Sequence, residues 1–345
     1  MRAPRLIMGA AVLTAVAAGL LTAEMILRRL LPVDTRYYVY APNLRQELHP
    51  SPQFLPGIEG TAVLRTNSDG IRGDEISPRH TYRILTVGAS TSENLYLDQS
   101  ETWAHRLQEL LSRQSKGVHR VWIGNIGRPG RRTRANILQL EYLLPQHSEI
   151  DAILLLLGGT DLMRRLSEDV EYDPRAMDRP EERTRIMARA FWSYGGAPPA
   201  TGIRGTAFWR LARRLRRATA EWRPASQNRD YDTTGSVFAT RRAHRAAASG
   251  IRDELPDLTS SLGEYVRNLD TLTAHARAHS VRIIFMTHPN MYRADLPAAE
   301  RRLLWMGNVG PYHEEPGHPY YSVRALAEGF AAYNRALLRF CEERG

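Results

Sequence analysis

Residues 152–157 are six apolar residues in succession, and they run directly into a Gly-Gly-Thr-Asp turn. A strand that is apolar at every position has to be buried on both faces, as in a parallel sheet that is covered by helices on both sides. Shorter apolar stretches at residues 83–87, 121–125 and 282–286 each predict a further strand. The chain is therefore expected to contain a sheet that is shielded from water on both faces.

Helices are predicted between these strands. Apolar residues recur at helical spacing in residues 103–111 and 137–144, and again in residues 261–279 and 321–340. Strands that alternate with helices indicate an α/β fold. We expect a doubly wound, three-layer (α/β/α) parallel sheet.

The chain is expected to have three parts. Residues 1–30 form a membrane anchor or signal segment, and residues 31–80, rich in proline and turn residues, predict an irregular extension. Residues 81–345 carry the α/β pattern. Within them, residues 163–255 are rich in arginine and broken by glycine and proline, which predicts a helical insertion with one clear helix at 206–222.

The N-terminal apolar segment is long enough to cross a membrane. Residues 6–23 carry no charge, and at a rise of about 1.5 Å per residue they span roughly 27 Å, close to the thickness of a bilayer core. A buried helix of a soluble protein is one alternative. A cleavable signal peptide is another, because residues 15–17 are Ala-Val-Ala. Since the apolar character continues beyond that point, we favour an uncleaved transmembrane helix over residues 6–27.

Composition narrows the classes of function. Cys341 is the single cysteine, which excludes an internal disulfide and a cysteine-based zinc site. The net charge is +10, but Lys116 is the only lysine and the arginines are spread along the whole chain. Zinc-finger spacing, RNA-binding motifs and heptads are absent from the sequence. We therefore expect no nucleic-acid partner.

Glycines and small polar residues follow the first three predicted strands. Ser90 follows the first strand, Gly130 lies after the second, and Thr160 follows the third. In open parallel sheets, ligands bind outside the carboxyl ends of the strands. An exposed serine, a proton acceptor and donors for an oxyanion are what acyl transfer requires. The alternative is a set of ordinary strand-to-helix turns, but three such turns in order favour one shared site.

These residues resemble the SGNH (GDSL-like) hydrolase family. The family's Gly-x-Ser-x block matches residues 88–91, its second-block glycine matches Gly130, and its Gly-x-Asn-Asp block partly matches residues 158–161. Residues 66–73 also resemble a segment that precedes the domain in membrane-anchored, exported members. The resemblance implies a flavodoxin-like SGNH fold, Ser90 as nucleophile, and Gly130 and Thr160 in the oxyanion hole, without a metal or cofactor.

The resemblance also implies a function and a location. Similar proteins are serine esterases or acyltransferases that act on ester-bearing lipids or cell-envelope polysaccharides. We accordingly expect a single-pass protein of the cytoplasmic membrane with its globular domain outside the cytoplasm. A cleaved, secreted form is the alternative.

Two departures from the family pattern bear on activity. Thr160 stands where the family has an asparagine, and the final hundred residues contain no Asp-x-x-His block to supply the catalytic acid and base. Either the chain is truncated, or another histidine serves as the base, or the domain is inactive and binds glycans or supports polysaccharide assembly. The candidate bases are His288, after the fourth strand, and His313 and His318 in a later loop. Asp161 is expected to brace the third turn.

Residues 313–318 contain two histidines and two glutamates, but their spacing does not match a metal site. The Arg-rich helix at 206–222 has two interpretations. It is either a solvated face that packs on the domain, or a contact with anionic lipid headgroups or an acidic polysaccharide. In the second case the contact residues are Arg210, Arg213, Arg214 and Arg217. A basic membrane-surface adaptor, resting on this helix alone, is a third class of function.

Overall fold

The computed structural model describes residues 3–31, 35–116, 118–194, 202–220, 232–293 and 295–344. The chain divides into two compact units. The smaller unit comprises Met1–Arg36 and Tyr194–Asn228, and the larger comprises Tyr37–Ser193 and Arg229–Gly345.

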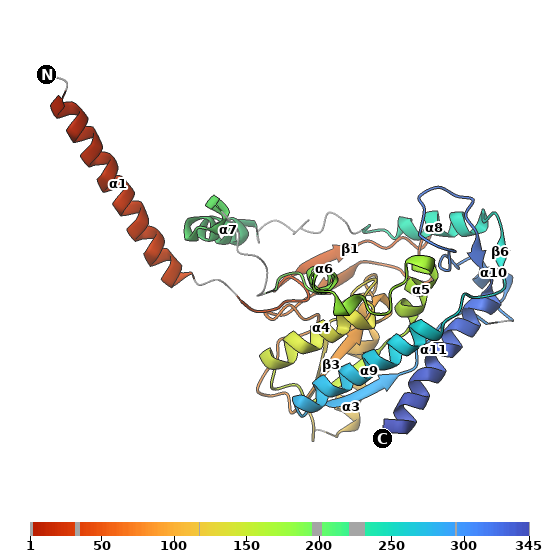
Figure 1. Cartoon of the computed structure of the whole chain (residues 1–345). Helices are drawn as coiled ribbons and strands as arrows, with labels where there is room; N and C mark the ends of the chain where they lie inside the picture. The colour runs from red at the N-terminus through yellow and green to blue at the C-terminus, as the bar shows by residue number, and fades with distance from the viewer. Residues whose placement is uncertain are drawn as a thin grey trace. The chain divides into compact units, whose positions relative to one another are not determined.

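A four-stranded parallel sheet forms the core of the larger unit, in the order β4-β3-β5-β7 (Figure 1). The strands are β3 (Tyr82–Gly88), β4 (Val121–Asn125), β5 (Ala152–Leu156) and β7 (Arg282–Met286). Every residue of β4 and β5 is buried. The prediction of an α/β fold built on a parallel sheet is confirmed.

The register of the sheet brings the carboxyl ends of its strands level. Gly88 at the end of β3 pairs with Leu156 at the end of β5, and Leu156 in turn pairs with Met286 at the end of β7. On the other side of β3, Thr86 pairs with Asn125, the last residue of β4. The turns after all four strands therefore leave the sheet at the same edge.

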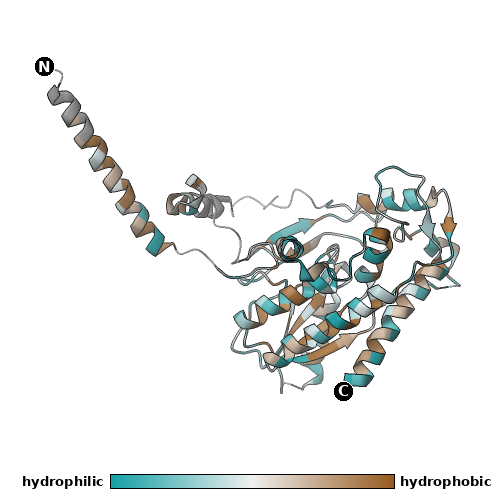
Figure 2. Ribbon diagram, in the orientation of Figure 1, coloured by the Kyte–Doolittle hydropathy of each residue, from teal (hydrophilic) through white to brown (hydrophobic). Residues whose placement is uncertain are grey.

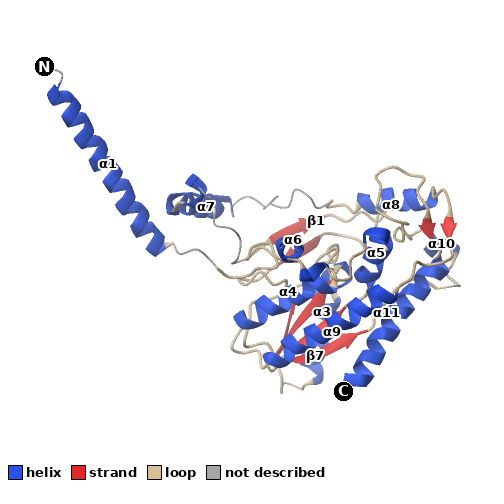
Figure 3. Cartoon of the chain, viewed as in Figure 1, coloured by secondary structure: helices blue, strands red, loops and turns tan. Residues whose placement is uncertain are grey.

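Helices cover both faces of the sheet, as Figure 3 shows. On one face, Ile84 and Leu154 pack in a cluster with the apolar side of α3. On the other face, Phe285 of β7 meets Phe340 of α11, with 5.8 Å between the ring centroids. Figure 2 shows the strands in apolar colours and the covering helices in mixed colours. The covering helices are α3 (Trp103–Gln114), α4 (Thr133–Leu143), α9 (Thr259–Ala278) and α11 (Val323–Arg344).

Shorter elements complete the larger unit. The helices are α2 (Ser90–Glu93), α5 (Gly159–Glu168), α6 (Pro180–Ala190), α8 (Ser236–Ala246) and α10 (Ala298–Arg301). An antiparallel pair is formed by β1 (Arg45–Leu48) and β2 (Ala62–Arg65), and a parallel pair by β6 (Ile251–Arg252) and β8 (Tyr320–Tyr321). Short 3-10 turns occur at Gln99–Glu101, Leu144–Gln146, Asp169–Glu171, Ala176–Asp178 and, in the smaller unit, Gly202–Gly205.

The expected extension and the expected insertion are each divided between the two units. From Tyr37 onward the extension belongs to the larger unit, where Arg72 forms an antiparallel bridge with Asn125 at the end of β4. Within the stretch 163–255, Tyr194–Asn228 belongs to the smaller unit, whereas α6 and α8 belong to the larger one. The Arg-rich helix predicted at 206–222 is observed as α7 (Ala207–Ala220).

The smaller unit contains α1 (Ala3–Leu30) and α7. By length and composition, α1 includes one candidate membrane span, Ala11–Leu30, with a mean hydropathy of 1.6 and no buried residues. Glu24 accepts hydrogen bonds from the backbone amides of Ala207, at 2.7 Å, and Phe208, at 3.2 Å. These amides belong to the first turn of α7, where helix N–H groups have no partner inside the helix.

Candidate active site

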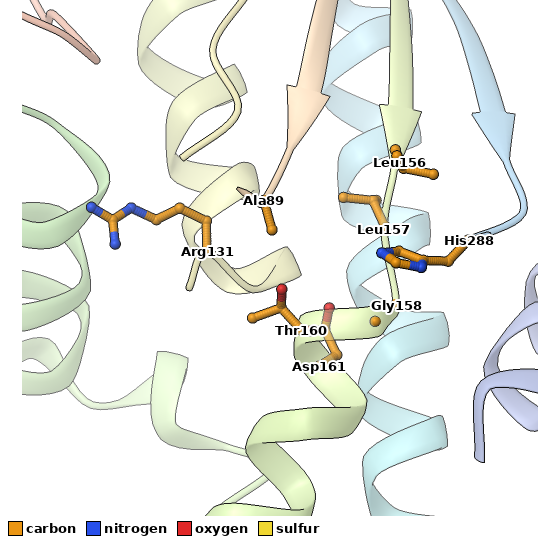
Figure 4. Close-up of a pocket in the computed structure, with 9 residues that line it drawn as sticks. Ala89, Arg131, Leu156, Leu157, Gly158, Thr160, Asp161 and His288 are labelled. Atoms are coloured by element: carbon orange, nitrogen blue, oxygen red, sulfur yellow. The ribbon is translucent and has the colours of Figure 1, made fainter. Parts of the chain in front are cut away.

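A small hollow lies at the carboxyl edge of the sheet (Figure 4). Residues from the turns after all four strands line it. Ala89 comes from the turn after β3, Arg131 from the loop after β4, and residues 156–161 from the end of β5 and the start of α5. His288, from the turn after β7, completes the lining. The edge predicted from the sequence is therefore the edge that carries a hollow.

Ser90 is the first residue of α2 and directly follows the lining residue Ala89. Its side chain is exposed. The turn around it is tightly packed, since a Cβ added to Gly127 would lie 2.6 Å from the Cβ of Ser92. The glycine at position 127 thus lets the loop after β4 approach the turn that carries Ser90.

Gly130 and Thr160 each carry a hydrogen-bond donor, and Thr160 lines the hollow whereas Gly130 is not part of its lining. Gly130 has a φ of 69°, in the left-handed region that favours glycine, and among the described residues no acceptor is found for its backbone amide. Thr160 lies in the first turn of α5 and lines the hollow. Within the same described part of the chain, its hydroxyl has no hydrogen bond to another protein group. The Thr160 hydroxyl is therefore available to a ligand in the hollow.

Asp161 also lines the hollow, but its carboxylate is engaged. It accepts hydrogen bonds from the Thr133 hydroxyl, at 2.7 Å, and from the Thr133 backbone amide, at 3.1 Å. Burial raises the pKa of this carboxyl to about 6, against the opposing effect of the Thr133 hydrogen bonds. Asn268 of α9 donates to the same Thr133 hydroxyl at 2.8 Å. Asp161 thus connects the start of α5 to the start of α4.

His288 is held by its backbone and by one ring nitrogen. Its backbone amide donates to Asn334 Oδ1 of α11 at 2.8 Å, and Asn334 Nδ2 donates to the His288 carbonyl at 3.1 Å. Nδ1 lies 2.8 Å from the carbonyl oxygen of Pro289. Because a carbonyl oxygen only accepts, Nδ1 carries the hydrogen and Nε2 keeps its lone pair. Burial lowers the pKa of His288, which favours the neutral form of the ring.

The basic nitrogen of His288 faces the turn after β5. A Cβ added to Gly159 would lie 2.6 Å from His288 Nε2. The ring also lies against Phe330 of α11, with 5.4 Å between the ring centroids. Nε2 is therefore positioned beside the residues that precede Thr160.

The other two candidate bases lie elsewhere. His313 and His318 stack on each other with 3.8 Å between ring centroids, in the loop between α10 and β8. Neither belongs to the lining of the hollow. Within the described ranges, no group of three or more His, Cys, Asp or Glu side chains could hold a metal ion. Of the four supporting residues suggested by the sequence, the hollow brings together Asp161 and His288.

Sequence reasoning missed a buried polar group behind the Ser90 turn. Arg72 and Glu93 are each 1% exposed, and Tyr40 is 4% exposed. The only signal for this group was the resemblance of residues 66–73 to a segment found in exported relatives. That resemblance contains Arg72 but does not indicate what its side chain contacts.

No family model and no curated protein matches the chain. Among solved structures, it is similar to TesA, with 15% identity and a TM-score of 0.26 over 75% of this chain and 99% of that one. It is similar to AlinE4, an SGNH-hydrolase family esterase, with 15% identity and a TM-score of 0.28 over 77% and 98% of the two chains. It is also similar to the psychrotrophic esterase EstA from Pseudoalteromonas sp., with 12% identity and a TM-score of 0.28 over 75% of this chain and 98% of that one. Identities and TM-scores this low assign neither a family nor an activity.

We expect Gly159→Ala to displace the His288 ring, because the added Cβ would lie 2.6 Å from Nε2 and 2.8 Å from Cε1. The free energy of unfolding in urea should fall by about 1–3 kcal/mol, as for other overpacked sites. Gly263→Ala in α9 is the control, since its added Cβ meets only Arg267 Nη1, at 3.5 Å. That variant should keep or slightly gain stability. Equal stability of the two variants would show that His288 is not packed on Gly159.

Proposed function

We propose that the protein is a serine-dependent ester hydrolase or acyltransferase of the SGNH type, with Ser90 as nucleophile. The observation that carries the proposal is the hollow at the carboxyl edge of the sheet that Ala89, Thr160 and His288 line. There the residue before Ser90, the free hydroxyl of Thr160 and the basic nitrogen of His288 converge from three strands. A nucleophile, a proton acceptor and oxyanion donors are the groups that acyl transfer requires.

In the proposed reaction, Ser90 Oγ attacks the acyl carbon of the ester while its proton passes to His288 Nε2. The carbonyl oxygen becomes an oxyanion, which accepts hydrogen bonds from the Gly130 amide and the Thr160 hydroxyl. When this intermediate collapses, the alkoxide leaving group takes the proton from His288 and the acyl group remains on Ser90. Water or an acceptor hydroxyl then gives its proton to His288, attacks the acyl group, and releases Ser90 by the reverse steps.

The partner of His288 Nδ1 is the backbone carbonyl of Pro289, not a carboxylate. A carbonyl fixes the tautomer as a carboxylate does, but it carries no negative charge to stabilise the imidazolium that forms. Because this arrangement lacks that charge, and because Thr160 stands in place of an asparagine, we expect a low rate of acyl transfer. The same arrangement is also the observation that supports the alternative function, an inactive domain of the same type that binds glycans or supports envelope polysaccharide assembly.

Labelling by a fluorophosphonate probe distinguishes these two functions. We expect the folded wild-type chain to be labelled and Ser90→Ala to remain unlabelled, because the phosphorus reacts with an activated serine hydroxyl. Ser92→Ala is the matched control in the same turn and should keep its labelling. His288→Ala should slow labelling by about 10²–10⁴-fold, the usual contribution of a general base, whereas His318→Ala should not.

Each contrary result has a definite meaning. Absence of labelling in folded wild type would contradict the enzyme and support the glycan-binding alternative. If labelling persists in His288→Ala but is lost in His318→Ala, the general base is His318 and not His288. The substrate class that we propose, an ester-bearing lipid or envelope polysaccharide, rests on the sequence resemblance and on the apolar N-terminal helix.

We further propose that residues 6–27 anchor the chain in the cytoplasmic membrane, with the larger unit outside the cytoplasm, and that α7 lies on the anionic lipid surface. Glu24 of α1 fixes the first turn of α7, and Arg210 Nε donates to the Leu31 carbonyl at 3.2 Å. Phe208 and Trp209 are each 39% exposed beside these contacts. The side chains of Arg213, Arg214 and Arg217 lie outside the described residues, so their proposed lipid contacts rest on the sequence.

Quenching of tryptophan fluorescence by brominated lipids tests the location of α7. In vesicles that contain anionic lipid, Trp209→Phe should remove a large part of the quenching seen in the reconstituted wild-type chain, since interfacial aromatic side chains reach the acyl boundary. Trp192→Phe, which removes a tryptophan that is 43% exposed in the larger unit, is the control and should leave the quenching unchanged. Equal quenching in both variants would contradict a surface-bound α7.

A further inference from the structure

Arg72 reaches the Ser90 turn from the segment that precedes the sheet. Its backbone forms a bridge with Asn125 at the end of β4, in which the Arg72 amide donates at 3.0 Å and the Asn125 amide donates at 2.8 Å. The Arg72 side chain is 1% exposed. A guanidinium is costly to bury unless its donors are satisfied.

The donors of Arg72 are satisfied by the residues that immediately follow Ser90. Nη1 donates to the carbonyl oxygens of Glu93 and Asn94, with 3.2 Å to the latter. Nη2 donates to the Leu97 carbonyl at 2.9 Å, and Nε donates to Gln99 Oε1 at 2.9 Å. The guanidinium therefore binds the carbonyl end of the helix that begins with Ser90.

This helix depends on outside partners. It has four residues, Ser90 to Glu93, and ends at Asn94, whose φ of 52° is left-handed. One helical turn contributes little hydrogen bonding of its own, because its last carbonyl groups have no partner within the helix. The planar fork of arginine suits several carbonyl oxygens at once, which an ammonium group does not.

Tyr40 and Glu93 form a second connection to the same turn. The Tyr40 hydroxyl lies within hydrogen-bonding distance of the Gly127 carbonyl oxygen and, at 3.1 Å, of Glu93 Oε1. The Tyr40 hydroxyl has one hydrogen and two acceptors within reach, so it donates to the Gly127 carbonyl oxygen or to Glu93 Oε1 and connects the two segments in either case. Burial raises the pKa of Glu93 to about 7, while Tyr40, Arg72, Arg128 and Arg131 act in the opposite direction.

Asn125 joins this turn to the loop that carries Gly130. Its Nδ2 donates to the Ser92 carbonyl at 2.6 Å, and its Oδ1 accepts from the Gly127 amide at 2.8 Å. The backbone of Arg72 holds Asn125, and the side chain of Arg72 holds the far end of α2. One residue thus fixes both the proposed nucleophile and the loop of a proposed oxyanion donor.

We propose that Arg72 is a positioning residue for acyl transfer. Its hydrogen bonds hold the Ser90 turn in the position and orientation that the proposed attack of Ser90 Oγ requires. The inference rests on the proposed function of Ser90. Arg72 itself touches no substrate, because it lies beneath the turn and outside the lining of the hollow. Its loss should therefore slow the chemical step and leave the binding of small probes nearly unchanged.

The test compares Arg72→Lys with Arg245→Lys in the full-length chain. Arg245 is a matched control, a partly buried arginine whose Nη1 and Nη2 donate to the carbonyl oxygens of Met306 and Tyr321. The rate of fluorophosphonate labelling is measured at several probe concentrations. The temperature is kept well below the thermal unfolding midpoint of either variant, so that both are folded. In Arg72→Lys, the maximal labelling rate should fall by about 10- to 100-fold, as expected for a displaced reacting group, with an unchanged half-saturating concentration. Arg245→Lys should label as wild type does.

Tyr40→Phe is the second variant, in case Arg72→Lys does not fold. It removes only the hydroxyl that joins Glu93 to Gly127, and it should also lower the maximal labelling rate. Labelling of Arg72→Lys or Tyr40→Phe at the wild-type rate, or at the rate of Arg245→Lys, would overturn the proposal.

Failure of the proposed function is a separate outcome. If Ser90 of wild type is not labelled, the proposed function fails, and hydrogen exchange of the amides of residues 91–97 then decides whether Arg72 positions the turn. Faster exchange in Arg72→Lys than in Arg245→Lys would support that role. Equal exchange in the two variants would overturn it.

Discussion

The parallel register of β3 between β4 and β5 is the constraint on which the site depends. Because every residue of β4 and β5 is buried, a shift of either strand would disrupt the close packing of its side chains on both faces of the sheet. With the register fixed, Gly88, Leu156 and Met286 end their strands side by side. The turns that begin there therefore lie next to one another. Small residues in them, such as Ala89, Gly158 and Gly159, leave room for the hollow.

Bringing these turns together does not by itself orient the side chains that they carry. Ser90 stands on a single helical turn, and the polar groups that hold this turn come from segments far apart in the chain, namely Tyr40, Arg72 and Asn125. His288 is held in a comparable way by Asn334 of α11. The apolar sheet thus determines which turns meet, while buried hydrogen bonds determine how each turn is oriented.

The sequence predicted the sheet well because its signals are local. The strands at 121–125 and 282–286 were found with their observed bounds, and the helix predicted at 261–279 is observed as Thr259–Ala278. The helices α6 and α8 were not separated from the Arg-rich stretch around them, since charged residues on both sides obscure the apolar period. The contacts of Arg72 could not be predicted, because a buried arginine is selected by carbonyl groups that only the fold brings to it. For the same reason the sequence did not decide among His288, His313 and His318, and the structure distinguishes His288 because it lines the hollow and packs against Gly159.

A crystal structure of the protein phosphonylated at Ser90 tests the central claim most directly, because the adduct places a charged oxygen where the oxyanion would form. The account predicts that this oxygen lies about 2.7–3.1 Å from the Gly130 amide and the Thr160 hydroxyl, with His288 Nε2 beside the Ser90 oxygen. A phosphonyl oxygen that points into solvent, with neither donor in reach and His288 turned away, would contradict the claim that the four strand ends form one catalytic site.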